Sequence, residues 1–322
     1  MKAVLGLDTS CYTTSAALVS TDGRLLAGAR RLLSVQQSER GLQQSAALFQ
    51  HVRALPDMVN EALSQVNNIE IAAVAASTKP RPTEGSYMPV FRAGESEART
   101  AAMLLGVPFF PVSHQQGHVR AALYESGLDA SKPFLALHLS GGTTELLLCK
   151  AGDLSLLGGT LDLHAGQLID RLGVRMGLPF PAGPEMEKLA AKGKAVGRIG
   201  VTIRGRDCCI SGAENKAAAW LDTGELQQED IAAEVFDFLV RTIERMIEQA
   251  EADAGCDQAL LAGGVASSLL FREMLRRRAA RRRLRCKLFF ARPELSGDNA
   301  VGVALLGADR LKGEKRHGGD SD

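Results

Sequence analysis

With 322 residues, of which 45% are hydrophobic, the chain is long enough to bury a sizeable core and to form two lobes. Aromatic residues make up only 5% of it, so the core is expected to consist of Leu, Val, Ile and Ala. The formal net charge of +1 excludes a globally basic nucleic-acid-binding protein but permits a local basic patch.

Cysteine spacing and hydropathy predict a soluble protein of the cytoplasm. The six cysteines include no Cys-x-x-Cys pair and no disulfide-like spacing, which favours free thiols in a reducing compartment. The N-terminus enters an apolar strand at once, without the pattern of a signal peptide, and no segment approaches a membrane span. We therefore expect no contact with a membrane.

A pattern of strand, Ser/Thr-rich turn, strand, turn and strand occurs twice. The first copy lies within residues 3–33, and the second, FLALHLSGGTTELLLCK followed by LSLLGGTL, lies within residues 134–161. The two turns align Ser10-Cys11-Tyr12-Thr13-Thr14 with Ser140-Gly141-Gly142-Thr143-Thr144. A repeat at this separation predicts two lobes of like topology and not a solenoid.

The rest of the chain alternates between helices and strands, which is typical of a mixed α/β fold. Helices are expected at residues 42–66, 95–105, 164–176, 185–191, 212–221, 231–254, 269–278 and from residue 299, and strands at 69–77, 259–261 and 287–290. We expect an N-terminal lobe at residues 1–130, with the final helix 299–311 packed back on it, and a C-terminal lobe at 131–298. The polar segment 312–322 is expected to be disordered.

Two histidines in the segment PVSHQQGHVRAALYE are candidate metal ligands. His114 and His118 lie one helical turn apart, so their imidazoles face the same side and suit one transition-metal ion. Ser113 is a favourable N-cap, which places the pair at the start of a helix. Unpaired amides at that helix start would also favour an anion such as phosphate. Two exposed surface histidines are the alternative.

Asp8 ends the first strand and is followed by Thr9 and Ser10. A carboxylate at this place can hold a hydrated metal or orient a water near phosphate, and a simple turn-forming aspartate is the alternative. In the second copy, Ser140-Gly141-Gly142 allows backbone amides to approach an anion closely.

A third Gly-rich loop, AGGVASS, lies between a buried strand and a helix. It contains Gly263, Gly264 and Ser268, and it would let the backbone approach a nucleotide base or sugar. A tight strand-to-helix turn is the alternative. Three such loops in this order predict a nucleotide site.

The three loops follow the order of two phosphate loops and one adenosine loop. In this order the chain resembles the actin/Hsp70/sugar-kinase superfamily, in which two ribonuclease-H-like lobes enclose a nucleotide cleft. Within it, the chain resembles the tRNA N6-adenosine threonylcarbamoyltransferase family (the TsaD type, formerly called O-sialoglycoprotein endopeptidase). The matching segments are LGLDTSCYTTSAAL, HQQGHVRAAL, LSGGTTELLL, AGQLIDRLGVRMGLPFPAGPEMEKLA, ISGAENKAAAWL, LAGGVASSLLFREML and FARPELSGDNAVGVALLG. They cover nearly the whole chain, and the combination of His-x-x-x-His with the final Gly-Asp-Asn is specific to this family.

The resemblance implies a metal held by His114, His118 and Asp298. Archaeal members of the family add a tyrosine, and His138 stands at the matching position. Three histidines and one aspartate suit Fe²⁺ or Zn²⁺ better than Mg²⁺. A core histidine bonded to backbone is the alternative for His138.

The resemblance also implies contacts with an adenine nucleotide, which could be threonylcarbamoyl-AMP, ATP or AMP. The implied contacts are Ser140, Gly141 and Gly142 near phosphates, Asp170 and Glu187 toward the ribose, Gly183 near the base or sugar, and Gly263, Gly264 and Ser268 in the adenosine loop. Asp8, Thr9 and Ser10 are the implied catalytic set.

The implied activity is metal-dependent transfer of a threonylcarbamoyl group from threonylcarbamoyl-AMP to N6 of the adenosine next to the tRNA anticodon. The expected partners are tRNA and small proteins of the threonylcarbamoylation system, and a dimer is compatible with the sequence.

Several loops depart from the family pattern. Tyr12 and Thr13 replace an acidic pair, Lys79-Pro80-Arg81-Pro82 replaces Gly-Pro-Gly-Leu, Ser268 replaces an asparagine, and Glu214 replaces a lysine. These changes keep open two alternatives. One is a divergent paralogue that binds or hydrolyses a nucleotide with another acceptor, and the other is a non-catalytic nucleotide- and metal-binding subunit.

One basic cluster stands out in residues 276–285, which contain seven arginines. A solvated helix end, where cations are favoured, is one interpretation, and a contact with tRNA phosphates is the other. No aromatic residues interleave the run, so base stacking is not expected there.

Overall fold

The computed structural model describes residues 1–10, 12–34 and 43–317, and the chain divides into two compact units. The first unit comprises Met1–Tyr124 and Gly297–Asp322, and the second comprises Glu125–Ser296. The sequence analysis placed the two boundaries after residues 130 and 298. Cys11 lies outside the described residues, and the five cysteines within them are free thiols.

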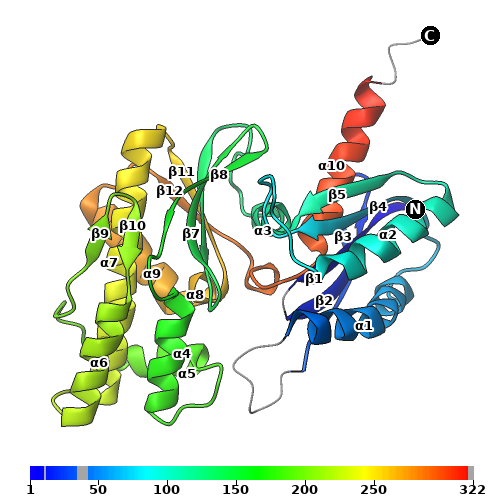
Figure 1. The fold of residues 1–322 in the computed structure, drawn as a ribbon. Helices are drawn as coiled ribbons and strands as arrows, with labels where there is room; N and C mark the ends of the chain where they lie inside the picture. Colours follow the sequence, from blue (N-terminus) through cyan, green and yellow to red (C-terminus); the bar gives the residue numbers. More distant parts are fainter. Residues whose placement is uncertain (11, 35–42, 318–322) are drawn as a thin grey trace. The chain divides into compact units, whose positions relative to one another are not determined.

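The first unit contains a five-stranded sheet in the order β3-β2-β1-β4-β5 (Figure 1). Its strands are β1 (Lys2–Ser10), β2 (Thr13–Ser20), β3 (Leu25–Leu32), β4 (Glu70–Lys79) and β5 (Phe109–Ser113). The first three are antiparallel neighbours, whereas β4 runs parallel to β1 and β5 runs parallel to β4. Strand β5 was not predicted; Pro111 lies within it and lacks a ladder amide, which is tolerated because β5 is an edge strand.

Helices cover both faces of this sheet, so β1 and β2 are buried almost throughout. The helices are α1 (Gln44–Ser64), α2 (Phe91–Leu105), α3 (His114–Leu123) and α10 (Val301–His317). Leu5 and Leu7 share an apolar cluster with α1 and α2, while Gly6 points toward α10. A Cβ at Gly6 would lie 2.6 Å from the backbone nitrogen of Ala304, so α10 packs directly on β1.

Helix α10 continues to His317, so residues 312–317 are helical where the sequence analysis predicted disorder. Lys, Glu and Arg are good helix formers, and the helix therefore extends into the polar segment. Residues 318–322 of the predicted disordered tail lie outside the described residues.

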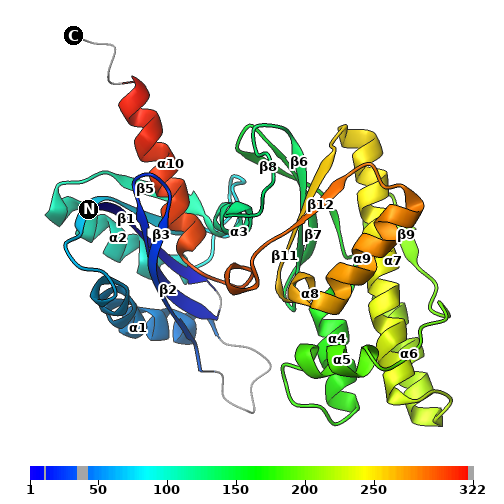
Figure 2. The ribbon, with the colours of Figure 1, turned by 180° about the vertical axis from the view of Figure 1, so that it is seen from behind.

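The second unit repeats the first topology (Figure 2). Its sheet has the order β12-β11-β6-β7-β8. Strands β6, β7 and β8 are antiparallel neighbours, whereas β11 runs parallel to β6 and β12 runs parallel to β11, as for the corresponding strands of the first unit. The predicted lobes of like topology are thus confirmed. The strands are β6 (Phe134–Leu139), β7 (Thr144–Lys150), β8 (Asp153–Gly159), β11 (Gln258–Ala262) and β12 (Lys287–Phe290), with a separate hairpin of β9 (Thr202–Arg204) and β10 (Asp207–Cys209).

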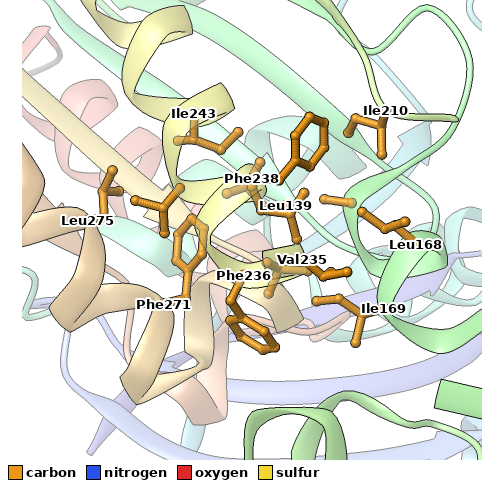
Figure 3. Packing of buried hydrophobic residues seen from close by; sticks show 14 of the residues in the cluster. Leu139, Leu168, Ile169, Ile210, Val235, Phe236, Phe238, Ile243, Phe271 and Leu275 are labelled. Carbon is orange, nitrogen blue, oxygen red and sulfur yellow. The ribbon is translucent and has the colours of Figure 1, made fainter. Parts of the chain in front are cut away.

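The helices of the second unit are α4 (Ala165–Arg175), α5 (Gly183–Ala190), α6 (Ser211–Thr223), α7 (Gln228–Ala254), α8 (Gly264–Ser267), α9 (Leu269–Arg282) and the 3-10 turn η1 (Pro293–Leu295). The longest helix of the described chain, α7, packs against α5, α6 and α9. The apolar residues at helical spacing on α7 are buried, and Figure 3 shows Phe236, Phe238 and Ile243 of this helix among Leu139, Phe271 and Leu275. None of the described helices combines the length and apolar composition needed to cross a bilayer.

Candidate functional site

Helix α3 begins as the sequence predicted. Ser113 is its N-cap, and its hydroxyl accepts the amide of Gln116 while the Gln116 side chain accepts the amide of Ser113. His114 and His118 then project from successive turns, with their Nε2 atoms 2.8 Å apart. The imidazoles therefore point toward one place, as the four-residue spacing implies.

Asp298 completes the group from the segment just before α10. Its Oδ1 lies 3.1 Å from Nε2 of His118 and 3.6 Å from Nε2 of His114. The three ligand atoms lie within 4.8 Å of one another. Two imidazole nitrogens and one carboxylate oxygen form a donor set suited to Zn²⁺ or Fe²⁺, and an ion held by these three residues would have room for a further ligand.

Two glycines allow this approach of segments that are far apart in the sequence. A Cβ at Gly302 would lie 1.8 Å from the carbonyl oxygen of Gly117, which belongs to the spacer between the two histidines. Helices α3 and α10 can therefore meet backbone to backbone only with glycine at 302. This contact fixes Asp298, four residues earlier, beside α3.

The fully buried carboxylate of Asp8 contacts the second ring nitrogen of His114. Oδ1 of Asp8 lies 3.1 Å from Nδ1 of His114 and accepts the hydroxyl of Ser77, and Oδ2 accepts the hydroxyl of Ser10 at 2.7 Å. A carboxylate on Nδ1 fixes the tautomer that leaves Nε2 free for a metal. The Phe91 ring packs 5.9 Å from the His114 ring, centroid to centroid, and limits its tilt. Asp8 thus acts on the group through His114 and does not itself face water.

Burial and charge act in opposite directions on this pair. Burial alone would raise the pKa of Asp8, but the His114 imidazole and the hydrogen bonds from His114 and Ser77 lower it below its ordinary value. Burial alone would lower the pKa of His114, but the carboxylates of Asp8 and Asp298 raise it to about 9. A metal ion bound by His114 must therefore displace a proton at neutral pH.

Thr9 lies outside this group. Its hydroxyl donates to the carbonyl oxygen of Val90 at 2.9 Å and accepts the amide of Gly94 at 3.2 Å, so it holds the start of α2. We call His114, His118 and Asp298 the metal group. Thr9 was predicted with Asp8 and Ser10 as part of a catalytic set, and of these three only Asp8 contacts a residue of this group.

The helix start also differs from expectation. The amide of Gln115 donates to the carbonyl oxygen of Pro80 at 3.0 Å, and the amide of Gln116 donates to Ser113. These two amides are engaged and are not available to a phosphate, contrary to the expectation of unpaired first-turn donors. The loop Lys79-Pro80-Arg81-Pro82 is instead hydrogen-bonded to the start of α3 through Pro80.

In the second unit, the turn Ser140-Gly141-Gly142 follows β6. The hydroxyl of Ser140 accepts the amides of Gly142 at 3.3 Å and Thr143 at 3.1 Å, which shapes the turn, and both glycines are exposed. Helix α4 starts against this turn, because a Cβ at Gly166 would lie 2.5 Å from the backbone nitrogen of Gly141.

The two predicted ribose carboxylates connect neighbouring helices. Oδ1 of Asp170 accepts the amide of Ala182 at 2.8 Å, and Asp170 also accepts the amide of Gly183. Burial raises the pKa of Asp170 despite these bonds. Oε1 of Glu187 accepts the amide of Leu270 at 2.8 Å and links α5 to the start of α9.

The third Gly-rich loop lies beside the first turn of this unit. Gly263 has a φ of +97°, and a Cβ there would lie 2.3 Å from the carbonyl oxygen of Leu139. Gly264 has open space around it, and Ser268 caps α9 by accepting the amide of Phe271 at 3.1 Å. Through these contacts the predicted nucleotide residues belong to one connected region of the second unit.

His138 lies on β6 in the second unit, half-buried, and a Cβ at Gly263 would lie 2.9 Å from its ring. It is not a member of the group His114, His118 and Asp298. Its ligation of the metal remains a prediction.

Sequence reasoning missed Ser77, Gly302 and Gly166. Ser77 lies near the end of β4, the parallel neighbour of β1, and carboxyl ends of parallel strands meet at one sheet edge, so its approach to Asp8 had a topological signal. The close helix contacts at Gly302 and Gly166 have no local signal.

A sequence profile described as tRNA N6-adenosine threonylcarbamoyltransferase matches residues 32–305. A protein of that name from Methanopyrus kandleri is 32% identical over 308 residues, which cover 94% of this chain and 86% of the relative. One from Thermofilum pendens is 28% identical and covers 95% and 88%. A probable bifunctional tRNA threonylcarbamoyladenosine biosynthesis protein from Methanocaldococcus jannaschii is 29% identical over 94% of this chain and 54% of its own length.

Solved structures share the fold at low identity. The ROK hexokinase from Thermus thermophilus has a TM-score of 0.59 and 16% identity, covering 97% of this chain and 99% of the other. HypF from T. kodakarensis has a TM-score of 0.65 and 14% identity, covering 97% of this chain and 48% of the other. These matches confirm the predicted actin/Hsp70/sugar-kinase fold class.

Proposed function

Because the chain belongs to the tRNA N6-adenosine threonylcarbamoyltransferase family, a family of transferases, we propose that it moves a threonylcarbamoyl group from threonylcarbamoyl-AMP to N6 of the adenosine next to the tRNA anticodon. The observation that carries this proposal is the convergence of two imidazole nitrogens and one carboxylate oxygen at His114, His118 and Asp298. In the reaction, the N6–carbonyl carbon bond forms, the carbonyl carbon–oxygen bond to AMP breaks, and N6 loses a proton.

His114, His118 and Asp298 would hold one Fe²⁺ or Zn²⁺ ion. Such an ion supplies Lewis-acid polarisation of the carbonyl that is attacked. Asp8 is a positioning residue in this proposal, because it fixes the orientation and tautomer of His114. His138 is proposed as a fourth ligand, to be tested separately by substitution.

The second unit would bind the adenine nucleotide and then the leaving AMP. Gly141 and Gly142 are exposed and offer backbone close to a phosphate, and Ser140 shapes their turn. Asp170 and Glu187 are acceptors for ribose hydroxyls, with Gly183 near the base or sugar. Gly263 and Gly264, followed by the α9 cap Ser268, would border the adenosine.

tRNA is the substrate that the family implies, and we propose small partner proteins in addition. Three consecutive apolar residues at the end of α2, Met103, Leu104 and Leu105, are exposed, which supports a protein-covered surface there. The alternative is that a second copy of this chain covers the surface, which would make the protein a dimer. We place the reaction in the cytoplasm, where tRNA is modified.

Nucleoside mass spectrometry tests the proposal. Unmodified tRNA is incubated with this protein, threonylcarbamoyl-AMP and candidate partners, and threonylcarbamoyl-adenosine is expected in the digested RNA. Asp298→Asn should remove at least 99% of the product, since it removes a metal ligand. Asp57→Asn is the matched control, because Asp57 is an exposed aspartate on α1 that pairs with Arg31, away from α3 and α10. Absence of product from the wild type, beside a positive control enzyme, would contradict the transferase proposal.

The altered loops favour a second candidate, a paralogue with another acceptor or without catalysis. Ser268 is engaged as a helix cap, and the loop at Lys79–Pro82 is attached to α3 through Pro80. Under this candidate the protein still binds AMP or ATP and a metal, but the tRNA stays unmodified. Nucleotide retention without product would favour it, and ATP turnover would separate a hydrolase from a binding subunit.

A further inference from the structure

Helix α9 presents two different faces to its surroundings. Phe271 and Leu275 are buried in the core of the second unit, and one turn further Arg278 forms an ion pair with Glu244, a fully buried carboxylate of α7. Arg282 adds a second, longer contact to Glu244 at 3.7 Å. The arginines of this face hold α9 on α7 and have a structural role.

The other face borders a hollow of about 420 Å³. Arg276, Ala279 and Ala280 line it from one stripe of α9, and Arg283, the C-cap of that helix with a φ of +56°, lines it as well. Leu284, just after α9, and Leu288, on β12, complete an apolar floor. We call this feature the arginine hollow.

The two arginines of the hollow are not neutralised. Within the described part of the chain, Arg276 and Arg283 have no ion pair with a carboxylate, in contrast to Arg277, which pairs with Glu273, and to Arg278. The guanidinium of Arg276 lies over the Phe290 ring, 4.6 Å from its centroid, which leaves its N–H edge available. Of the seven arginines in residues 276–285, Arg277, Arg278 and Arg282 pair with carboxylates, and the remaining four leave an excess of positive charge around the hollow.

A second hollow, lined mainly by residues of α7 and of the segment that includes β9, serves as an internal comparison. It measures about 540 Å³ and is bordered by Arg245 and Arg282, but Glu248 also lines it and lies 4.0 Å from Arg282. Its positive charge is therefore partly compensated, whereas that of the arginine hollow is not.

We propose that the arginine hollow binds the phosphodiester backbone of tRNA. This inference rests on the proposed function, which supplies tRNA as the substrate. Guanidinium groups bind phosphate oxygens in a bidentate manner, and the apolar floor of the hollow fits the ribose between two phosphates. Because the floor has no aromatic side chain, the contact positions the RNA and does not read its sequence.

The experiment measures the salt dependence of tRNA binding by the full-length protein. A fluorescently labelled tRNA transcript is titrated at several KCl concentrations between 50 and 200 mM. The variant Arg276→Ala/Arg283→Ala is compared with the control Arg175→Ala/Arg277→Ala, which removes two exposed arginines of the same unit that are paired with Asp222 and Glu273. Circular dichroism and thermal unfolding verify that both variants are folded.

We expect the hollow variant to lower the slope of log Kd against log[KCl] by about 1.4 to 1.8, at about 0.7 to 0.9 per phosphate contact, and to weaken binding about tenfold at 100 mM salt. The control should keep the wild-type slope. Equal slopes in both variants, or no binding of tRNA by the wild type at 50 mM salt, would overturn the inference. Loss of binding to phosphatidylserine vesicles in the hollow variant, with tRNA binding unchanged, would overturn it in favour of a membrane surface.

Nucleoside mass spectrometry on the same samples separates this inference from the proposed function. Product with an unchanged salt slope means that the transferase proposal holds and the hollow is not the RNA contact. A reduced slope in the hollow variant without product from the wild type means that the hollow binds RNA and the proposed reaction is wrong.

Discussion

The first hairpin presents different groups in the two units, although the strands that carry it have the same order. In the first unit the last three residues of β1, Asp8, Thr9 and Ser10, are fully buried and their side chains bond to other residues, while Tyr12 in the turn is exposed. In the second unit Gly141 and Gly142 are exposed and carry no side chain. One copy of the repeat therefore forms a rigid, side-chain-built support, and the other forms an open, backbone-built surface.

Under the proposed function, this difference would let one topology serve two ligands. A transition metal needs ligand atoms held in fixed positions, which buried hydrogen bonds such as Asp8 to His114 provide. A phosphate needs several amides that can be approached closely, which glycines at an exposed turn provide. If the comparison is right, substitutions in one unit should change the binding of one ligand and leave the other unaffected.

The largest expected effect is the loss of metal from His114→Ala and from Asp298→Ala. Each substitution removes one of three proposed ligands, so metal affinity should fall at least a hundredfold, while both variants should remain folded because the side chains of His114 and Asp298 are 19% and 30% exposed. Metal content by plasma mass spectrometry and AMP affinity by calorimetry test this together. Unchanged metal content in both variants would refute the assignment of the site.

Removal of the support behind the metal group should have a smaller effect. Asp8→Asn keeps the size of the side chain but removes the charge that orients His114, and metal affinity should fall ten- to a hundredfold. Ser10→Ala is the matched control. Ser10 bonds to the other carboxylate oxygen of Asp8, so this substitution should lower metal affinity less than Asp8→Asn. A competition titration with a chromogenic chelator measures both, and equal losses in the two variants would contradict the role of Asp8.

Gly166→Ala should disturb the exposed turn of the second unit without touching the metal group. The new methyl group would lie 2.5 Å from the backbone nitrogen of Gly141, so the turn must shift, at a cost of about 1–3 kcal/mol in unfolding free energy. AMP affinity should fall severalfold, and metal affinity should stay at the wild-type value. Gly200→Ala, at a glycine with open space around it, is the control for a substitution without a clash.

The smallest expected effect is a pH dependence that comes from the first unit. His51 on α1 is fully buried, its Nδ1 lies 2.8 Å from the Thr14 hydroxyl, and burial lowers its pKa to about 4. The unfolded chain, with a pKa near 6.5, takes up the proton first as the pH falls, so this group weakens the folded state between pH 6.5 and 4. The slope is at most about 1.4 kcal/mol per pH unit.

His51→Asn removes the titration and keeps a polar group near Thr14. The difference in unfolding free energy between wild type and variant should therefore shrink in that range as the pH falls. Denaturant unfolding at pH 4.5, 5.5 and 6.5 measures it, and a difference that is independent of pH would contradict the prediction.

Local features of the fold and site were predictable from sequence. The spacing of His114 and His118 and the cap at Ser113 are set by neighbours within one turn, so periodicity and capping rules located them. The repeat of strand and turn patterns also led to two units of like topology, because each copy carries the same alternation of apolar runs and turns.

Features that depend on tertiary contacts were not predictable in the same way. The hydroxyl of Thr9 looks like part of a phosphate loop, but it bonds to Val90, which is 81 residues away. Asp298 entered the predicted site only through family resemblance, because its approach to α3 depends on the contact of Gly302 with Gly117. Strand β5 was missed because it is short and contains Pro111, which argues against a strand unless the strand lies at an edge.

The return of the chain to the first unit at Gly297 sets an order of events during synthesis. The metal group needs Asp298 and the contact of α10 with α3, yet the whole second unit, Glu125–Ser296, is translated between His118 and Asp298. A nascent chain that ends within the second unit thus has two of the three metal ligands and an uncovered face of β1. If this group binds the proposed metal, loading would consequently be a late event of biogenesis, completed after the contiguous second unit has been made.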